Sequence, residues 1–153
     1  MFRSLPRNYL AALVLFITAF APAAAFAKDP VYTGRFSTLA VEGYDAVAYF
    51  TDGKPVKGAK DFVTTYNGAE WRFASAGNLA LFEVAPEKYV PQYGGYCAWA
   101  VSQGYTASAD PTQWRIVNGK LYLNYNAEIQ QRWAQDIPAN ISAANANWPN
   151  VLR

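Results

Sequence analysis

Two Asn-Gly pairs, each set between β-rich runs, constrain the fold of this chain more than any other feature. The pairs are Asn67-Gly68 and Asn118-Gly119. The β-rich runs around them are 61–66, 69–73, 114–117 and 120–125. Asparagine and glycine tolerate the positive φ angles of a type I′ turn, which fits the twist of a hairpin. Each pair therefore predicts a β-hairpin, and together they predict a small antiparallel sheet.

Three to four short helices are expected to pack with this sheet. Residues 43–50 fit either a strand or a short helix, and we favour a helical turn over residues 46–50 that Asp45 can cap. Ser75 can cap a longer helix that ends near Ala85, because Pro86 follows. Both predicted helices lie before the second hairpin.

Further helix signals lie in the second half of the chain. The expected segments are a helix over 96–102 that starts at Gly94-Gly95 and ends at Gly104, a helix from Asn126 that Pro138 interrupts, and a last short helix over 141–148. No internal repeat, linker or low-complexity tract is seen between these elements. Residues 28–153 are therefore predicted to form one α+β domain.

Residues 1–27 have the pattern of a cleaved secretory signal. Arg3 and Arg7 form a positive start, and a short apolar run follows over residues 10–20. Ala25-Phe26-Ala27 is a small-x-small cleavage site. The apolar run is shorter than the roughly 20 residues that a membrane span needs. We therefore expect cleavage after Ala27, a soluble periplasmic or secreted product, and no membrane span in that product.

Cleavage also changes the charge and the chemistry of the chain. Removing 27 of the 153 residues leaves 126, and losing Arg3 and Arg7 reduces the 13 basic residues to 11, equal to the 11 acidic ones. A neutral product disfavours nucleic acid as a partner. The product also has no histidine, no methionine and one cysteine. This composition excludes Cys-His and Ser-His nucleophile pairs, histidine metal clusters, CxxC redox pairs and disulfides within the chain.

Cys97 is the single candidate for thiol chemistry. If it lies in the first turn of a helix after Gly94-Gly95, unpaired amides there would lower the pKa of its thiol and favour the thiolate. The alternative is a small buried core residue, since Tyr96, Ala98 and Trp99 surround it and free cysteines are commonly buried. A disulfide between molecules is the third interpretation.

Aromatic side chains near Cys97 suggest a ligand pocket. The candidate lining residues are Tyr44, Asp45, Tyr93, Tyr96, Trp99 and Tyr105. Tyrosine and tryptophan offer flat apolar faces with a polar tip, but so small a domain also needs aromatic residues for its core. Asp45 is interpreted as a helix cap, with a buried acceptor or a ligand for a hard metal ion as alternatives. Asp110-Pro111 is interpreted as a turn or a helix start.

The stretch from Tyr66 to Tyr89 resembles the YHS domain family. The residues that carry the resemblance are Tyr66-Asn67-Gly68, Trp71-Arg72-Phe73-Ala74-Ser75, Phe82 and Pro86-Glu87-Lys88-Tyr89. The flanking segments 43–50, 93–98 and 119–125 are similar to an exported, larger subgroup that includes selenoproteins. With these segments the resemblance covers residues 42–135.

Shorter members of that family use cysteines around this hairpin as metal ligands, and this chain lacks those cysteines. Ala74 and Asn78 stand at two such positions, and no cysteine lies near Tyr44-Asp45. A site for a soft metal ion needs thiolate, thioether or imidazole donors, so we assign no metal ligands at these positions.

The resemblance and the composition together predict an exported binding or accessory module without catalysis of its own. Its ligand would be a metal held by oxygen donors and Cys97, a small molecule, or another exported protein; no cofactor is assigned. The alternatives are a thiol redox protein that uses Cys97, and a structural or assembly factor with an aromatic interface.

Overall fold

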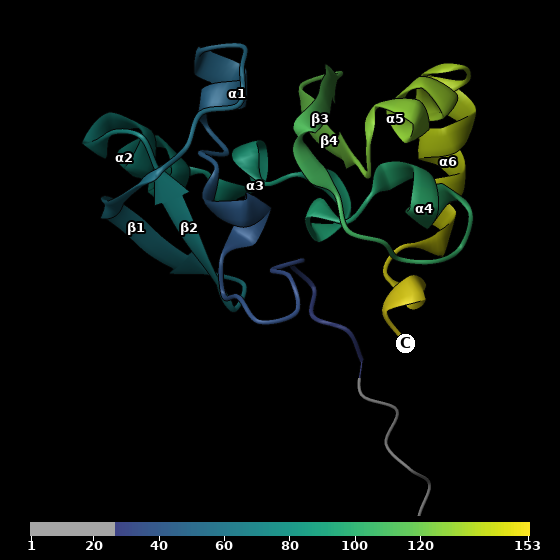
Figure 1. Ribbon diagram of the computed structural model, residues 1–153, viewed down its shortest axis with the longest axis horizontal. Helices are drawn as coiled ribbons and strands as arrows, with labels where there is room; N and C mark the ends of the chain where they lie inside the picture. Colours follow the sequence, from purple (N-terminus) through teal and green to yellow (C-terminus); the bar gives the residue numbers. More distant parts are fainter. Residues whose placement is uncertain (1–26) are drawn as a thin grey trace, which may run out of the picture.

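The computed structural model describes residues 27–153 (Figure 1). The expected signal segment therefore lies outside the described residues, apart from Ala27. The helices are α1 Ala48–Thr51, α2 Ala76–Val84, α3 Pro86–Tyr89, α4 Ala98–Ser102, α5 Ala127–Ala134 and α6 Ile137–Asn147, with short 3-10 turns η1 Ala40–Gly43, η2 Gln92–Gly95 and η3 Asn150–Leu152. The strands are β1 Ala59–Tyr66, β2 Ala69–Phe73, β3 Asp110–Val117 and β4 Lys120–Asn124. Within residues 27–153, no helix is both long enough and apolar enough to cross a bilayer.

Both Asn-Gly hairpins are confirmed. Asn67 and Gly68 have φ angles of 49° and 78°, and Asn118 and Gly119 have 51° and 73°, as a type I′ turn requires. The α+β class is confirmed as well. The two hairpins do not join, however: β1 pairs with β2 in one two-stranded sheet, and β3 pairs with β4 in another.

The helix caps follow the sequence signals, and the two prolines also lie in the first turns of helices that were not predicted at these positions. Ser75 accepts a hydrogen bond from the backbone of Asn78 at the start of α2, and Asn126 caps α5 in the same way. The helix expected to end near Ala85 does so, since α2 ends at Val84 with Ala85 as its C-cap. Pro86 also begins α3, and Pro138 is the second residue of α6, because proline fits the first turn of a helix, where no amide partner is lost. The helix expected over 96–102 begins later, at Ala98, with Cys97 as its N-cap residue.

The two halves of the described chain contain the same succession of elements. Strands β1 and β3 each have eight residues, β2 and β4 each have five, and the second pair starts 51 positions after the first. The pairing register shifts at the same place in both hairpins, between Ala59 and Val63 in one and between Asp110 and Trp114 in the other. The expectation that the chain has no internal repeat was wrong.

The recurrence extends to the turn before each hairpin. Three successive residues of η1, from Val41 to Gly43, have φ angles of 50°, 51° and 77°. The residues from Tyr93 to Gly95 in η2, 52 positions later, have 56°, 61° and 84°. Left-handed backbone is uncommon for tyrosine and costly for a β-branched valine, so its repetition at equivalent places is a specific structural match. We call residues 40–89 the first unit and residues 92–141 the second unit.

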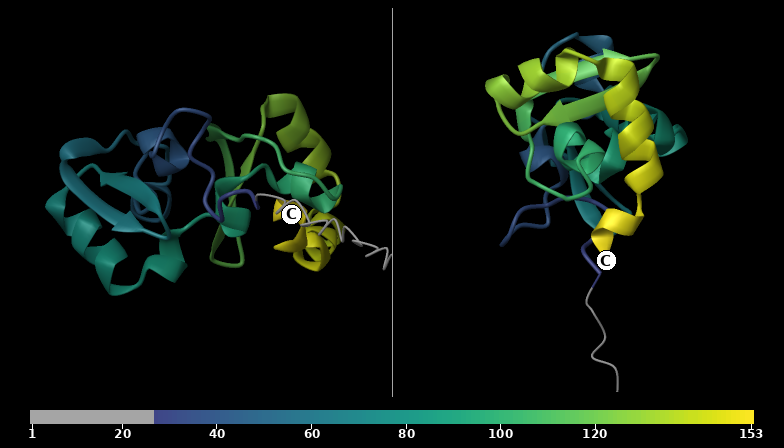
Figure 2. Two further views of the ribbon diagram at one scale, coloured as in Figure 1. Left: turned by 90° about the horizontal axis from the view of Figure 1, so that it is seen from below. Right: turned by 90° about the vertical axis from the view of Figure 1, so that its right-hand side faces the viewer.

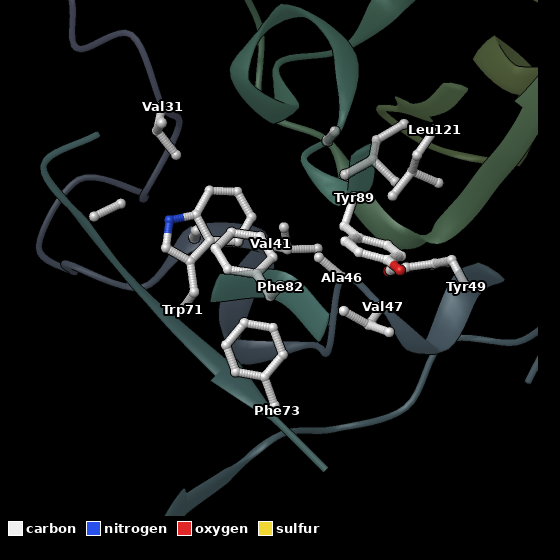
Figure 3. Packing of buried hydrophobic residues seen from close by; sticks show 14 of the residues in the cluster. Val31, Val41, Ala46, Val47, Tyr49, Trp71, Phe73, Phe82, Tyr89 and Leu121 are labelled. Carbon is white, nitrogen blue, oxygen red and sulfur yellow. The ribbon is translucent and has the colours of Figure 1, made fainter. Parts of the chain in front are cut away.

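The two units lie side by side and share one core. In Figures 1 and 2, β1, β2 and α2 form one lobe, and β3, β4, α4, α5 and α6 form the other. The main buried cluster extends from Trp71 and Phe73 in the first lobe to Leu121 on β4 (Figure 3). Leu123, also on β4, belongs to the same cluster. Tyr49 connects the lobes, since its hydroxyl donates to the Pro111 carbonyl at 2.8 Å. This shared core fixes the relative position of the units.

Candidate functional site

Cys97 lies at the base of a small apolar pocket. The cavity has a volume of about 200 Å³, and its walls are mostly apolar: Cys97, Trp99, Ala100, Tyr105, Ala107, Tyr125 and Ile129 line it. Cys97 is 1% exposed, whereas Tyr105 and Tyr125 are 48% and 53% exposed. The thiol therefore forms the floor, and the two tyrosine rings stand at the mouth. Trp99 and Tyr105 meet edge to face, with their ring centroids 6.4 Å apart.

Burial controls the chemistry of the thiol. Desolvation raises the pKa of Cys97 above its ordinary value. Backbone hydrogen bonds from Ala100, Tyr125 and Trp99 lower the pKa without cancelling this effect. The net direction is opposite to the one expected for a thiol activated at a helix start, and the structure instead has the buried cysteine of the alternative interpretation.

A buried amide network supports the floor of the pocket. Asn124, which is fully buried on β4, accepts hydrogen bonds from the Trp99 amide at 3.1 Å and from the Cys97 thiol at 3.7 Å. Its amide nitrogen donates to Gln130 at 2.7 Å, and Gln130 donates in turn to the Trp114 carbonyl. Since every polar atom of the Asn124 side chain has a partner, the network holds β4 and α5 at a set distance from α4.

Asp45 is buried in the first unit as part of a different arrangement, which we call the Asp45 clasp. Its Oδ1 accepts from the amides of Val47 at 2.8 Å and Ala48 at 3.1 Å, so it caps the turn at α1 as predicted. Its Oδ2 accepts from the Ala74 amide at 2.8 Å and from Asn78 Nδ2 at 2.7 Å. The carboxylate thus ties α1 to the end of β2 and to α2. Cap and buried acceptor, offered as alternatives from the sequence, are both present.

The structure does not bring the aromatic candidates into one pocket. Of the five residues grouped with Asp45 in that hypothesis, Trp99 and Tyr105 line the pocket over Cys97. Tyr93 and Tyr96 are buried against Trp148, in the second hydrophobic cluster. Tyr44 lies under the Lys57 ammonium, which is 3.9 Å from its ring centroid. Each of these three tyrosines therefore serves packing between elements.

The pocket also contains residues that were not predicted from the sequence. Tyr125, Ile129 and Ala107 lie on its wall, and Asn124 supports it from below. The sequence signal for Asn124 was a polar residue in the apolar pattern of β4. The equivalent position of β2, 51 residues earlier, is Phe73. The interpretation of Asp110-Pro111 also changes: these residues begin β3, and Asp110 accepts hydrogen bonds from the amide and hydroxyl of Thr112.

Comparison with known families adds one match to this geometry. Residues 47–93 match the YHS domain. The matched YHS segment begins at the Asp45 clasp, contains the first hairpin, and ends in the turn that opens the second unit. No curated protein and no solved structure matches the chain.

The residues of the Asp45 clasp, which lies at the start of the matched segment, do not fit a metal ion. Both oxygens of Asp45 already accept two hydrogen bonds each, and four N–H donors would face any cation placed there. Asn78 points its nitrogen, not its oxygen, at the carboxylate. Within residues 27–153, no group of three histidine, cysteine or acidic side chains is close enough to hold a metal. We therefore assign no metal ligand in this segment.

Proposed function

We propose that the chain is an exported YHS-type binding module that holds one small apolar ligand in the pocket over Cys97 and has no catalysis of its own. The pocket itself supports this proposal: it is a preformed cavity with aromatic walls and one buried thiol. Sites for small molecules are typically concave and mostly apolar, with few polar groups. Export rests on the signal pattern of residues 1–27, and cleavage after Ala27 would leave Lys28 as the first residue.

The volume of the pocket limits the ligand to about one ring. An apolar cavity of about 150 Å³ can take a benzene molecule, so about 200 Å³ accommodates a monocyclic aromatic with one or two substituents. A charged ligand is disfavoured because the described lining residues carry no charged side chain to pair with it. A neutral phenol such as p-cresol is therefore a suitable probe.

The test is a titration of the mature chain with p-cresol, in which binding is measured by calorimetry or by the chemical shifts of the Tyr125 and Ile129 amides. We expect one site per chain with a dissociation constant between about 10 μM and 1 mM, as a ligand of this size allows. Ala107→Leu adds apolar volume inside the pocket and should abolish binding. Ala139→Leu makes the same change on an exposed surface of α6 and serves as the matched control. Equal binding by both variants would refute the pocket as the site.

A thiol redox function makes a different prediction for the same pocket. It requires that Cys97 react with an alkylating agent in the folded protein at neutral pH. Since the thiol is 1% exposed and burial raises its pKa, we expect alkylation in the folded protein to be much slower than in the unfolded chain. Fast alkylation at pH 7 that p-cresol does not block would favour the redox function over ligand binding.

A further inference from the structure

Asp45 and Cys97 occupy equivalent positions in the two units. Each follows a left-handed turn and a tyrosine, Tyr44 in the first unit and Tyr96 in the second. The backbone around them is bonded alike: the Asp45 amide donates to the Val56 carbonyl at 2.8 Å, and the Cys97 amide donates to the Ala107 carbonyl at 3.0 Å. The two side chains therefore project from the same place in the unit.

The backbone donors around the two side chains are also equivalent. The Asp45 carboxylate receives the amides of Val47, Ala48 and Ala74. The backbone amides 51 or 52 positions later, those of Trp99, Ala100 and Tyr125, lie around Cys97 and lower the pKa of its thiol. The Trp99 amide donates to Asn124 Oδ1 in this unit. Both units therefore place equivalent backbone amides around one buried side chain, which is a carboxylate in the first unit and a thiol in the second.

One further pair of equivalent residues, Asn78 and Ile129, differs in what its side chains contact beside these amides. Asn78 and Ile129 are each the third residue of the helix after the hairpin, and each donates its amide to the cap residue. Asn78 reaches back and donates to the Asp45 carboxylate. Ile129 has no group that can do so, and its side chain lies instead on the wall of the pocket.

We infer that this chain contains one site twice, closed in the first unit by the Asp45–Asn78 contact and open in the second unit as the pocket over Cys97. The part that concerns ligand occupancy rests on the proposed function, but the equivalence of the two places does not. The site would then be closed where the pair is Asp45 and Asn78, and open where the pair is Cys97 and Ile129. The chain should bind one ligand and not two, although it contains two units.

Transfer of the first pair into the second unit tests this inference. Cys97→Asp alone buries a carboxylate without its side-chain partner, and we expect it to lower the midpoint of thermal unfolding by more than about 5 °C. Adding Ile129→Asn supplies the missing donor, so the double variant should regain at least about half of that loss and should no longer bind p-cresol. The control combines Cys97→Asp with Ile137→Asn, which lies in the other hydrophobic cluster. In this control, the losses in unfolding midpoint caused by the two substitutions should add.

The reverse transfer covers the case in which Cys97→Asp does not fold. Asp45→Cys leaves the Asn78 amide without its acceptor, and Asn78→Ile leaves the carboxylate short of a donor, so each should lower the midpoint. The double variant reproduces the pair that the second unit contains and should unfold at a higher temperature than Asp45→Cys alone.

The outcomes separate the two proposals. Favourable coupling in either transfer supports the equivalence of the sites, even if wild-type protein does not bind p-cresol, in which case the proposed function alone fails. Additive losses in both transfers, or double variants that fail to fold in both units, would overturn the equivalence. Binding of two probe molecules by the wild type would overturn the statement that the first site is closed.

Discussion

Replacement of Asp45 by asparagine tests the clasp with the smallest change of shape. One carboxylate oxygen becomes an NH₂ group, which can no longer accept the two donors it served. The Val47 and Ala48 side of the clasp is fully buried, whereas Ala74 is exposed and Asn78 is half-buried. The new NH₂ group should therefore turn toward Ala74 and Asn78, where water can reach and the cost of an unpaired donor is lower.

The magnitude follows from the donors that lose their acceptor. Asn78 can rotate its amide and present its oxygen to the new NH₂ group, which recovers one hydrogen bond. The Ala74 amide then loses its acceptor and faces an NH₂ donor, at a cost near the low end of the range for an unpaired donor, about 1 kcal/mol, since water can reach it. The remaining bonds also lose the strength that the charged carboxylate provides. We expect Asp45→Asn to lower the free energy of unfolding by about 2–3 kcal/mol.

Urea unfolding followed by tryptophan fluorescence measures this loss, because Trp71 and Trp133 are buried. The matched control is Asp61→Asn on β1, which is exposed and should change stability by less than about 0.5 kcal/mol. A loss below about 1 kcal/mol for Asp45→Asn, with an unchanged denaturant dependence, would refute the clasp as a stabilising contact.

Three further predictions concern the backbone, pH and metal content. Gly94→Ala should lower the free energy of unfolding by at least about 3 kcal/mol, because the added Cβ would lie 1.8 Å from the Pro30 carbonyl oxygen. Gly119→Ala is the control in the same urea assay: Gly119 has a similar positive φ and no neighbour within 4 Å, so the loss should be only about 1–2 kcal/mol. Burial raises the pKa of Cys97 above its ordinary value, so the unfolded chain loses this proton first and stability should fall as the pH rises through the ordinary thiol pKa. Cys97→Ala should reduce that slope, and an unchanged slope would contradict the prediction. Elemental analysis of the purified protein should find well under one metal ion per chain, and a stoichiometric metal that Asp45→Ala removes would contradict the closed clasp.

Local features of the fold were predictable because their interactions span few residues. A type I′ turn needs two residues that accept positive φ, and Asn67-Gly68 meets that need without help from the rest of the chain. The caps at Ser75 and Asn126 reach only three residues along the chain. Pro86 was correctly predicted to follow the end of a helix, but the helices whose first turns contain Pro86 and Pro138 were not predicted to start there. Whether a helix starts at such a proline depends on whether the following segment finds a packing surface.

The repeat could not be recognised in the sequence because the units share backbone geometry more than side chains. Val41 and Tyr93 occupy equivalent left-handed positions although their side chains differ in size and shape. Asp45 and Cys97 likewise differ in charge, and Phe73 and Asn124 differ in polarity. Aligned strands of equal length and equal register shift revealed the equivalence, and these are properties of pairing that the sequence shows only weakly.

The sequence by itself determined the hairpins, the main helix caps and the resemblance of residues 66–89 to the YHS family, since each depends on neighbouring residues or on a linear motif. Tertiary structure decided the site. Trp99 and Tyr105 meet Tyr125 and Ile129 only because α4 packs against the second hairpin and α5. The pKa of Cys97 was decided in the same way, because desolvation depends on everything packed around the thiol and outweighs the local effect of nearby amides.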